Sequence, residues 1–270
     1  MPESRLGELT VPIGLAVVGG GLAQLAGPLA LDGAALAVSA AWVASAILVA
    51  WVVLPAKRTW SGVGALEGTW FLVPATFLAD GIGVGILAGR GPTSLHQPLG
   101  WLALVSVGTG VLGYGAVLIL AALRVARSDL GRVAGAPWWI AAGCGGLAAA
   151  AVGRLGSAGP WSETSALRHA VGLSAFGLWV VASAVAIPVL IGSAAYLWRL
   201  RSLAGHPPWP PTFSTGVYAL GATQAGHLLA LEPVTSVARL AASATVLLWS
   251  LTILAHLPAV TRSRLPGRPR

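Results

Sequence analysis

The chain has 270 residues, of which 56% are hydrophobic and only 9% are charged, whereas a soluble domain carries about 25% charged residues. So few charges do not cover the surface of a soluble domain of this size, and the mean hydropathy of +0.81 indicates the same. The single cysteine, Cys144, excludes a disulfide-stabilised secreted scaffold. The abundance of Leu, Val, Ala and Trp excludes a disordered chain. The composition therefore predicts a helical membrane protein with several spans.

The formal net charge of +8 raises the question of nucleic-acid binding. The sixteen basic residues lie almost entirely between long apolar runs or in the tails, and they form no basic stripe interleaved with aromatic residues. We therefore expect no nucleic-acid partner, and we interpret these residues as loop charges that set the membrane topology.

Eight apolar runs are long enough to cross a hydrocarbon core of about 30 Å, which needs roughly 20 residues per helix. The runs lack the period-two alternation of outer-membrane barrel strands. We predict one all-α transmembrane domain over residues 1–270, with short tails at 1–8 and 259–270. The expected helices are Leu9–Gly27, Ala34–Leu54, Gly68–Leu87, Leu99–Leu123, Pro137–Val152, Ala170–Leu197, Phe213–Leu231 and Val234–Leu257.

The connections between these runs alternate in charge. Twelve of the sixteen basic residues fall in the two tails and in the loops after the second, fourth and sixth runs, which leaves four on the opposite side. Basic residues stay preferentially in the cytoplasm. We therefore expect both termini in the cytoplasm and the protein in the plasma membrane.

The first run also fits a signal peptide, with a small-residue cleavage site near Ala34–Ala37. Its Pro12 and its glycines at 19–21 suit a packed helix better than a signal core. We expect this run to stay in the bundle.

A weak repeat of about sixty to seventy-five residues groups the eight runs into four hairpins. The third, fifth and seventh runs open with aromatic residues (Trp70, Trp138 and Phe213) and then become rich in Gly and Ala. Small residues let helices approach closely in lipid, where hydrophobic expulsion does not drive pairing. We therefore expect the odd helices, with Gly143 among them, to form an inner set around a central path, and the even helices to form the outer ring. Pro74 is expected to bend the third helix, either beside that path or as a simple packing kink.

Asp80 lies about twelve residues into the third run. An ionised carboxylate inside a bilayer is costly, so it is expected to face the bundle interior and to have a partner there. Gln24, Arg154 and His227 are the candidates at comparable depth. One hypothesis makes Asp80 and His227 a proton relay, and the other, which we favour, makes Asp80 a group that holds helices together.

Neutral donors inside the bundle, including Thr76 and Thr223, are candidates either for contacting an anion or for bonding a neighbouring helix. No His, Cys, Asp and Glu spacing resembles a metal site. The sequence holds no phosphate-binding loop or nucleophile elbow, and only eight acidic residues. We expect no enzyme activity, no cofactor and no metal.

Four segments of the chain, in order, resemble a known family. Residues 68–76 (Gly-Thr-Trp-Phe-Leu-Val-Pro-Ala-Thr) are similar to the fifth helix of the tellurite-resistance/dicarboxylate transporter family, which includes the slow-type plant anion channels. Residues 138–143 resemble the opening of its seventh helix, 178–199 its eighth, and 213–219 its ninth. The resemblance covers the third to the eighth run.

The resemblance implies ten helices in five hairpins, assembled as a homotrimer, with the odd helices around a path for small anions. Dicarboxylates such as malate, tellurite and sulfite are the implied substrates. A phenylalanine on the ninth helix closes that path in the family, and by position this role falls on Phe213. Without the resemblance, Phe213 is equally well interpreted as an aromatic residue at the membrane interface.

Two departures from the family are evident. The first hairpin is missing, which a misplaced start codon would also explain, and Ser214 and Phe77 replace residue types that the family prefers. The alternative function is therefore a non-conducting membrane scaffold or partner subunit, and a membrane enzyme comes third. The candidate path and gate residues are Pro74, Thr76, Asp80, Gly143, Phe213, Thr223 and His227.

Overall fold

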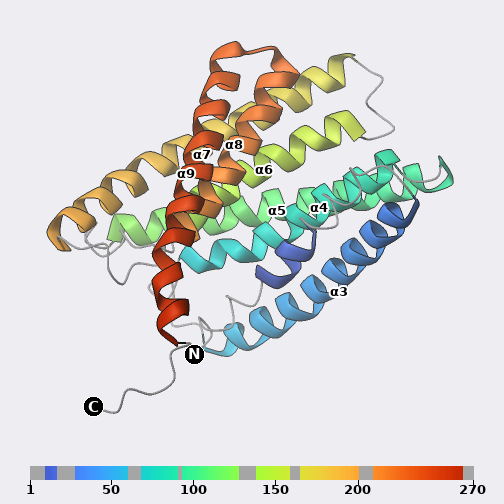
Figure 1. Cartoon of the computed structure of the whole chain (residues 1–270). Coiled ribbons are helices and arrows are strands. Elements are labelled where there is room, and N and C mark those ends of the chain that lie inside the picture. The colour runs from blue at the N-terminus through green and yellow to red at the C-terminus, as the bar shows by residue number, and fades with distance from the viewer. Residues whose placement is uncertain are drawn as a thin grey trace.

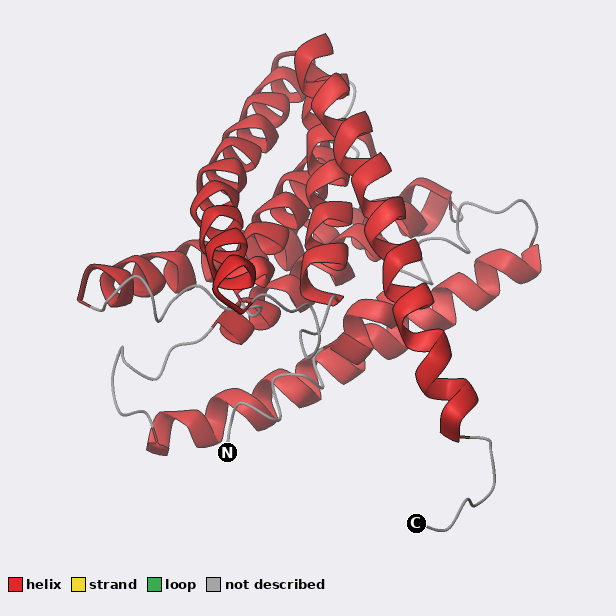
Figure 2. Ribbon diagram, turned by 60° about the vertical axis from the view of Figure 1, so that its left-hand side comes forward, coloured by secondary structure: helices red, strands yellow, loops and turns green. Residues whose placement is uncertain are grey.

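The computed structural model describes residues 10–16, 28–59, 68–90, 93–127, 138–158, 165–200 and 209–263. These residues form eight α-helices and a 3-10 turn, and no strand occurs among them (Figure 2). A short helix occupies residues 10–16. The remaining helices are α3 (Pro28–Thr59), α4 (Leu72–Arg90, preceded by the 3-10 turn η3 at Gly68–Phe71), α5 (Thr93–Arg127), α6 (Trp139–Ala158), α7 (Ser165–Leu200), α8 (Trp209–Leu229) and α9 (Glu232–Ser263).

Most helices extend beyond the apolar runs that predicted them. The α5 helix has 35 residues, which gives a length of about 52 Å at 1.5 Å per residue, against a hydrocarbon core of about 30 Å. The apolar run marks only the part that lies in lipid, whereas the backbone hydrogen bonds continue into the polar zone. The α9 helix likewise continues to Ser263, into the tail predicted at 259–270, and its C-terminal end projects from the bundle (Figures 1 and 2).

Six of the described helices are long and apolar enough to cross a membrane, and they belong to α3, α4, α5, α6, α7 and α9. The fold is that of an all-α polytopic membrane protein, as predicted. The α8 helix is not among the six, because Thr, Ser, Gln and His residues interrupt its apolar sequence.

The helices pair as antiparallel hairpins of one inner and one outer member. In the hairpins α4–α5, α6–α7 and α8–α9, neighbours in sequence pack against each other, and α6 also packs against both α4 and α8. Most of α4 and α6 is buried, whereas only a minor part of α3, α5, α7 and α9 is buried. The prediction that the odd helices form the inner set is confirmed for α4 and α6. In Figure 1, α3 to α7 run from lower left to upper right, and α8 and α9 stand closer to vertical.

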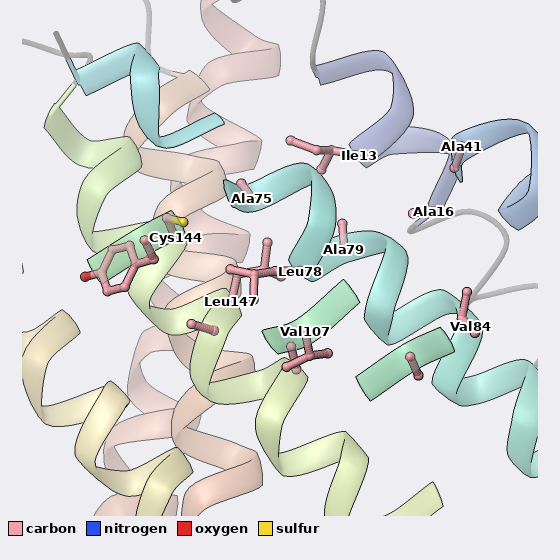
Figure 3. Packing of buried hydrophobic residues seen from close by; sticks show 14 of the residues in the cluster. Ile13, Ala16, Ala41, Ala75, Leu78, Ala79, Val84, Val107, Cys144 and Leu147 are labelled. Atoms are coloured by element: carbon pink, nitrogen blue, oxygen red, sulfur yellow. The ribbon is translucent and has the colours of Figure 1, made fainter. Parts of the chain in front are cut away.

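The N-terminal helix packs into this bundle. Ile13 and Ala16 are 4% and 2% exposed, and they lie close to Ala79 of α4 and Ala41 of α3 (Figure 3). A side chain on Gly83 of α4 would meet Val38 of α3 and the carbonyl oxygen of Ala16. The missing side chain of Gly83 therefore lets three helices meet at one point, as expected for a packed first helix.

The α8–α9 hairpin turns within two residues. The Leu231 N–H donates to the Gly226 carbonyl oxygen (2.9 Å), and Ala230 has φ 53°. This is the arrangement of a Schellman helix end, in which a left-handed residue follows the last helical turn. Glycine usually occupies that position, because a Cβ there is unfavourable.

Candidate functional site

The structure divides the seven candidate residues into two groups. Pro74, Thr76 and Asp80 on α4 and Gly143 on α6 are buried in helix contacts. Phe213, Thr223 and His227 lie on α8, where Phe213 and His227 are exposed and Thr223 is half-buried.

One face of α8 is not covered by another of the described helices, although α8 packs against three neighbouring helices. Ser214 and Tyr218 face α6, Gly216 and Gly226 face α9, and Tyr218 also faces α7. The open face carries three side chains spaced by seven residues, which places them in one line along the helix. This stripe consists of Phe213, Leu220 and His227, all exposed, with Phe213 and Leu220 each 38% exposed.

Two half-buried residues, also spaced by seven, border the stripe on the α6 side. They are Val217, which packs against the main core, and Gln224. The Gln224 side chain packs against Gly153 of α6, since a Cβ added to Gly153 would lie 2.6 Å from Gln224 Cβ. The α8 helix holds no acidic residue. The stripe therefore has an imidazole at one end, with the Gln224 amide beside it, and a phenyl ring at the other end.

The threonine hydroxyls do not bond neighbouring helices. Thr76 Oγ1 donates to the Val73 carbonyl oxygen (2.6 Å), and Thr223 Oγ1 donates to the Ala219 carbonyl oxygen (2.8 Å). Both bonds run back along the threonine's own helix, a common arrangement for this residue type. The expectation of bonds between helices is therefore wrong for these two hydroxyls.

Pro74 does not interrupt the hydrogen bonds of the third helix. The α-helix begins at Leu72 after the 3-10 turn, so Pro74 is its third residue. The N–H groups of a first helical turn have no partner within the helix, and a proline there removes none. The ring instead packs against α5, where Pro74 Cβ is 3.3 Å from the position of a Gly113 Cβ. The expected bend beside a path has no basis at this position.

Gly143 serves helix packing. A Cβ on Gly143 would lie 2.7 Å from Ser214 Oγ and 2.9 Å from Ser214 Cα. Its neighbours behave in the same way, because a Cβ on Gly145 would meet Tyr114 and Ala182, and one on Gly146 would meet Tyr218. The glycines of α6 therefore bring α8, α5 and α7 close to it, as expected in lipid, and their surfaces are covered by those helices.

Asp80 is 1% exposed and lies near the middle of the span Gly68–Arg90. Ser45 of α3, also 1% exposed, faces its carboxyl group. The two groups are not in the geometry of a formed hydrogen bond, since Asp80 Oδ1 and Ser45 Oγ have no hydrogen-bond partner among the described residues. Sequence reasoning did not single out Ser45. A small-residue stripe at Ala34, Val38, Ala41 and Ser45, spaced by three and four residues, would have indicated it.

The structure does not bring Asp80 and His227 together. Asp80 faces α3, whereas His227 is exposed on α8, and no hydrogen bond or ion pair joins the two. Arg154 forms no hydrogen bond with Asp80 Oδ1 either, and Gln24 lies outside the described residues. The direct relay of the first hypothesis is therefore absent.

Polar contacts between helices involve residues that the sequence did not single out. The Ser183 and Tyr218 hydroxyls share a hydrogen bond of 2.8 Å between α7 and α8, and Trp139 Nε1 donates to Ser193 Oγ (2.9 Å) between α6 and α7. Tyr114, in contrast, is 2% exposed with a hydroxyl that has no partner among the described residues.

Within the ranges that the structure describes, no three His, Cys, Asp or Glu side chains gather as a metal site.

A scan of family models, a search of curated proteins and a search of solved structures found no match to this chain.

Proposed function

We propose that this chain is an integral membrane transporter or channel for small anions of the dicarboxylate, tellurite or sulfite class. The path follows the inner helices and uses the stripe of α8 formed by Phe213, Leu220 and His227. Phe213 is its gate. One observation carries the proposal. The α8 helix packs against three helices, yet none of the described helices covers the face that bears Phe213, Leu220 and His227, which has a polar side chain at one end.

The charges of the described residues favour an anion over a cation along this face. No acidic residue lies on α8, and the one buried carboxylate, Asp80, faces α3. The Gln224 amide and the His227 imidazole supply hydrogen-bond donors near one end. A small set of donors suits conduction, because an ion must bind and also leave.

The position of Phe213 fits a gate at the opposite end. His227 lies fourteen positions further along the helix, which is about 21 Å at 1.5 Å per residue. The resemblance of residues 213–219 to the family's ninth helix assigns the closing phenylalanine to this position. A ring at one end of a path about 20 Å long closes it without occupying the donor end.

Flux into proteoliposomes tests this function. The purified chain is reconstituted, and uptake of labelled malate, sulfite and tellurite is followed under an imposed gradient. Phe213→Ala is expected to raise the uptake of at least one anion several-fold, because it removes the closing ring. Phe176→Ala is the matched control, since it removes a phenyl ring that belongs to α7 and not to the stripe, where it packs against Trp179. No uptake by the wild type or by Phe213→Ala would contradict the proposal.

A second candidate function is a non-conducting membrane scaffold, and the close packing of α6 favours it. Gly143 and Gly146 contact α8 directly, and Gly153 contacts Gln224 of α8. At these three glycines, therefore, no opening separates α6 from α8. The same flux experiment distinguishes the two functions, because a scaffold passes no anion with or without the phenyl ring.

A further inference from the structure

The buried carboxylate between α3 and α4 poses a problem of charge. Asp80 is 1% exposed at the middle of a span, and its Oδ1 has no hydrogen-bond partner among the described residues. An ionised carboxylate at the centre of a membrane helix is costly, because it has lost its contact with water. Such a residue persists where something compensates it.

The described residues place no cation in hydrogen-bond contact with Asp80 Oδ1. The Glu232 carboxylate pairs with Arg239 within α9. The helix at 10–16 carries no titratable side chain. The titratable side chains described on α4 and on the elements packed against it are Asp32, Arg90, His96, Tyr114, Arg124, Cys144 and Arg154. None of them forms a hydrogen bond with Asp80 Oδ1.

The surroundings of Asp80 supply oxygen atoms. Ser45 faces the carboxyl group from α3, and its Oγ is also without a partner. One turn further along α4, Gly83 leaves room for the Ala16 carbonyl oxygen, which is 3.4 Å from the position that a Gly83 Cβ would take. Carboxylate, hydroxyl and carbonyl oxygens are the ligands of hard cations.

We propose that the Asp80 carboxylate and the Ser45 hydroxyl together bind one monovalent cation between α3 and α4. A single carboxylate balances one positive charge, whereas a divalent ion would leave a net charge in the bilayer core. The compensating charge is carried by Na⁺ or by a proton. This site is independent of the stripe on α8, and the proposal holds whether or not the chain transports anions.

Thermal unfolding of the full chain in detergent tests the site and identifies the ion. The melting temperature is measured with NaCl and with choline chloride at equal ionic strength, and at pH 5 and pH 7.5, for the wild type and for Asp80→Asn. Asp32→Asn is the control, because it removes an exposed carboxylate from α3. A rise with Na⁺ in the wild type and the control that is lost in Asp80→Asn identifies sodium.

The proton has a different signature. If it is the ion, lowering the pH without Na⁺ raises the melting temperature of the wild type and the control relative to Asp80→Asn, because the other titratable groups are the same in the wild type and Asp80→Asn. Equal responses of wild type and Asp80→Asn to both sodium and pH overturn the proposal.

A second variant keeps the test decisive if Asp80→Asn does not fold. Ser45→Ala retains the carboxylate and removes one ligand, so the sodium or proton concentration at half-maximal stabilisation should rise about tenfold. An unchanged midpoint for Ser45→Ala would overturn the role of the hydroxyl and, with it, the two-residue site.

Discussion

Gly146 of α6 lies directly against the backbone of Tyr218 in α8, so that a Cβ on Gly146 would be 2.6 Å from Tyr218 Cα. No side chain separates the two helices at this point. The contact holds two inner helices together and orients α8, including the face that carries Phe213 and His227.

Gly146→Ala should therefore destabilise the bundle. The methyl group meets backbone atoms, which cannot move aside as a flexible side chain would, and overpacking of this kind costs about 1–3 kcal/mol. Gly177→Ala on α7 is the matched control, because nothing lies within 4 Å of its Cβ position, and it should be neutral or slightly stabilising. Unfolding in detergent by denaturant measures both, and equal stability of the two variants would contradict the packing role.

The two tyrosines near α6 should respond in opposite ways to loss of the hydroxyl. Tyr114→Phe should stabilise the fold by about 1 kcal/mol or more, because it removes a buried hydroxyl that has no partner. Tyr218→Phe should destabilise it by about 1 kcal/mol, since it breaks the hydrogen bond to Ser183. Melting temperatures of the two variants in the same detergent give the comparison, and a loss of stability in Tyr114→Phe would show that its hydroxyl has a partner.

Ala230→Gly should stabilise the α8–α9 hairpin. Ala230 adopts φ 53°, where a Cβ costs roughly 1–2 kcal/mol, and glycine removes that cost. Part of the gain is lost to the greater freedom of glycine in the unfolded chain, so an increase of about 1 kcal/mol is expected. Ala242→Gly, at an exposed helical position on α9, should instead lose about 0.5–1 kcal/mol.

Cys144 should be inert toward thiol reagents in the folded protein. It is the only cysteine of the chain and is 2% exposed in the main core. A water-soluble maleimide should label it only after unfolding in SDS. Rapid labelling of the native protein would place water beside α6 and contradict the closed packing of its glycines.

The sequence predicted the helices and their inner or outer position because both depend on local patterns. Apolar runs of about 20 residues locate spans, and the glycines of the fifth run indicated a helix that others approach closely, which the contacts of Gly143, Gly145 and Gly146 confirm. The limits of the helices were less accurate, since α5 and α7 continue into polar residues that hydropathy excludes.

The details of the candidate site depend on where each helix begins and on how it is rotated about its own axis. The identity of a single residue reveals neither. Pro74 was expected to bend a helix, but its effect depends on the helix start, which the η3 turn moves to Leu72. Asp80 was assigned partners by depth alone, whereas its orientation on α4 directs it toward Ser45 of α3. The stripe of α8 was partly predicted, because Phe213 and His227 were named without Leu220 between them.

The accessibility of Leu220 to water tests the central claim most directly. In a Cys144→Ala background, Leu220→Cys is treated in proteoliposomes with a charged, membrane-impermeant thiol reagent, and Leu240→Cys on α9, where the native side chain is 71% exposed, serves as the lipid-facing control. Labelling at position 220 and none at 240 is the result that a water-filled path along α8 predicts. Equal protection of both positions would mean that the stripe faces lipid or protein, and it would contradict the path.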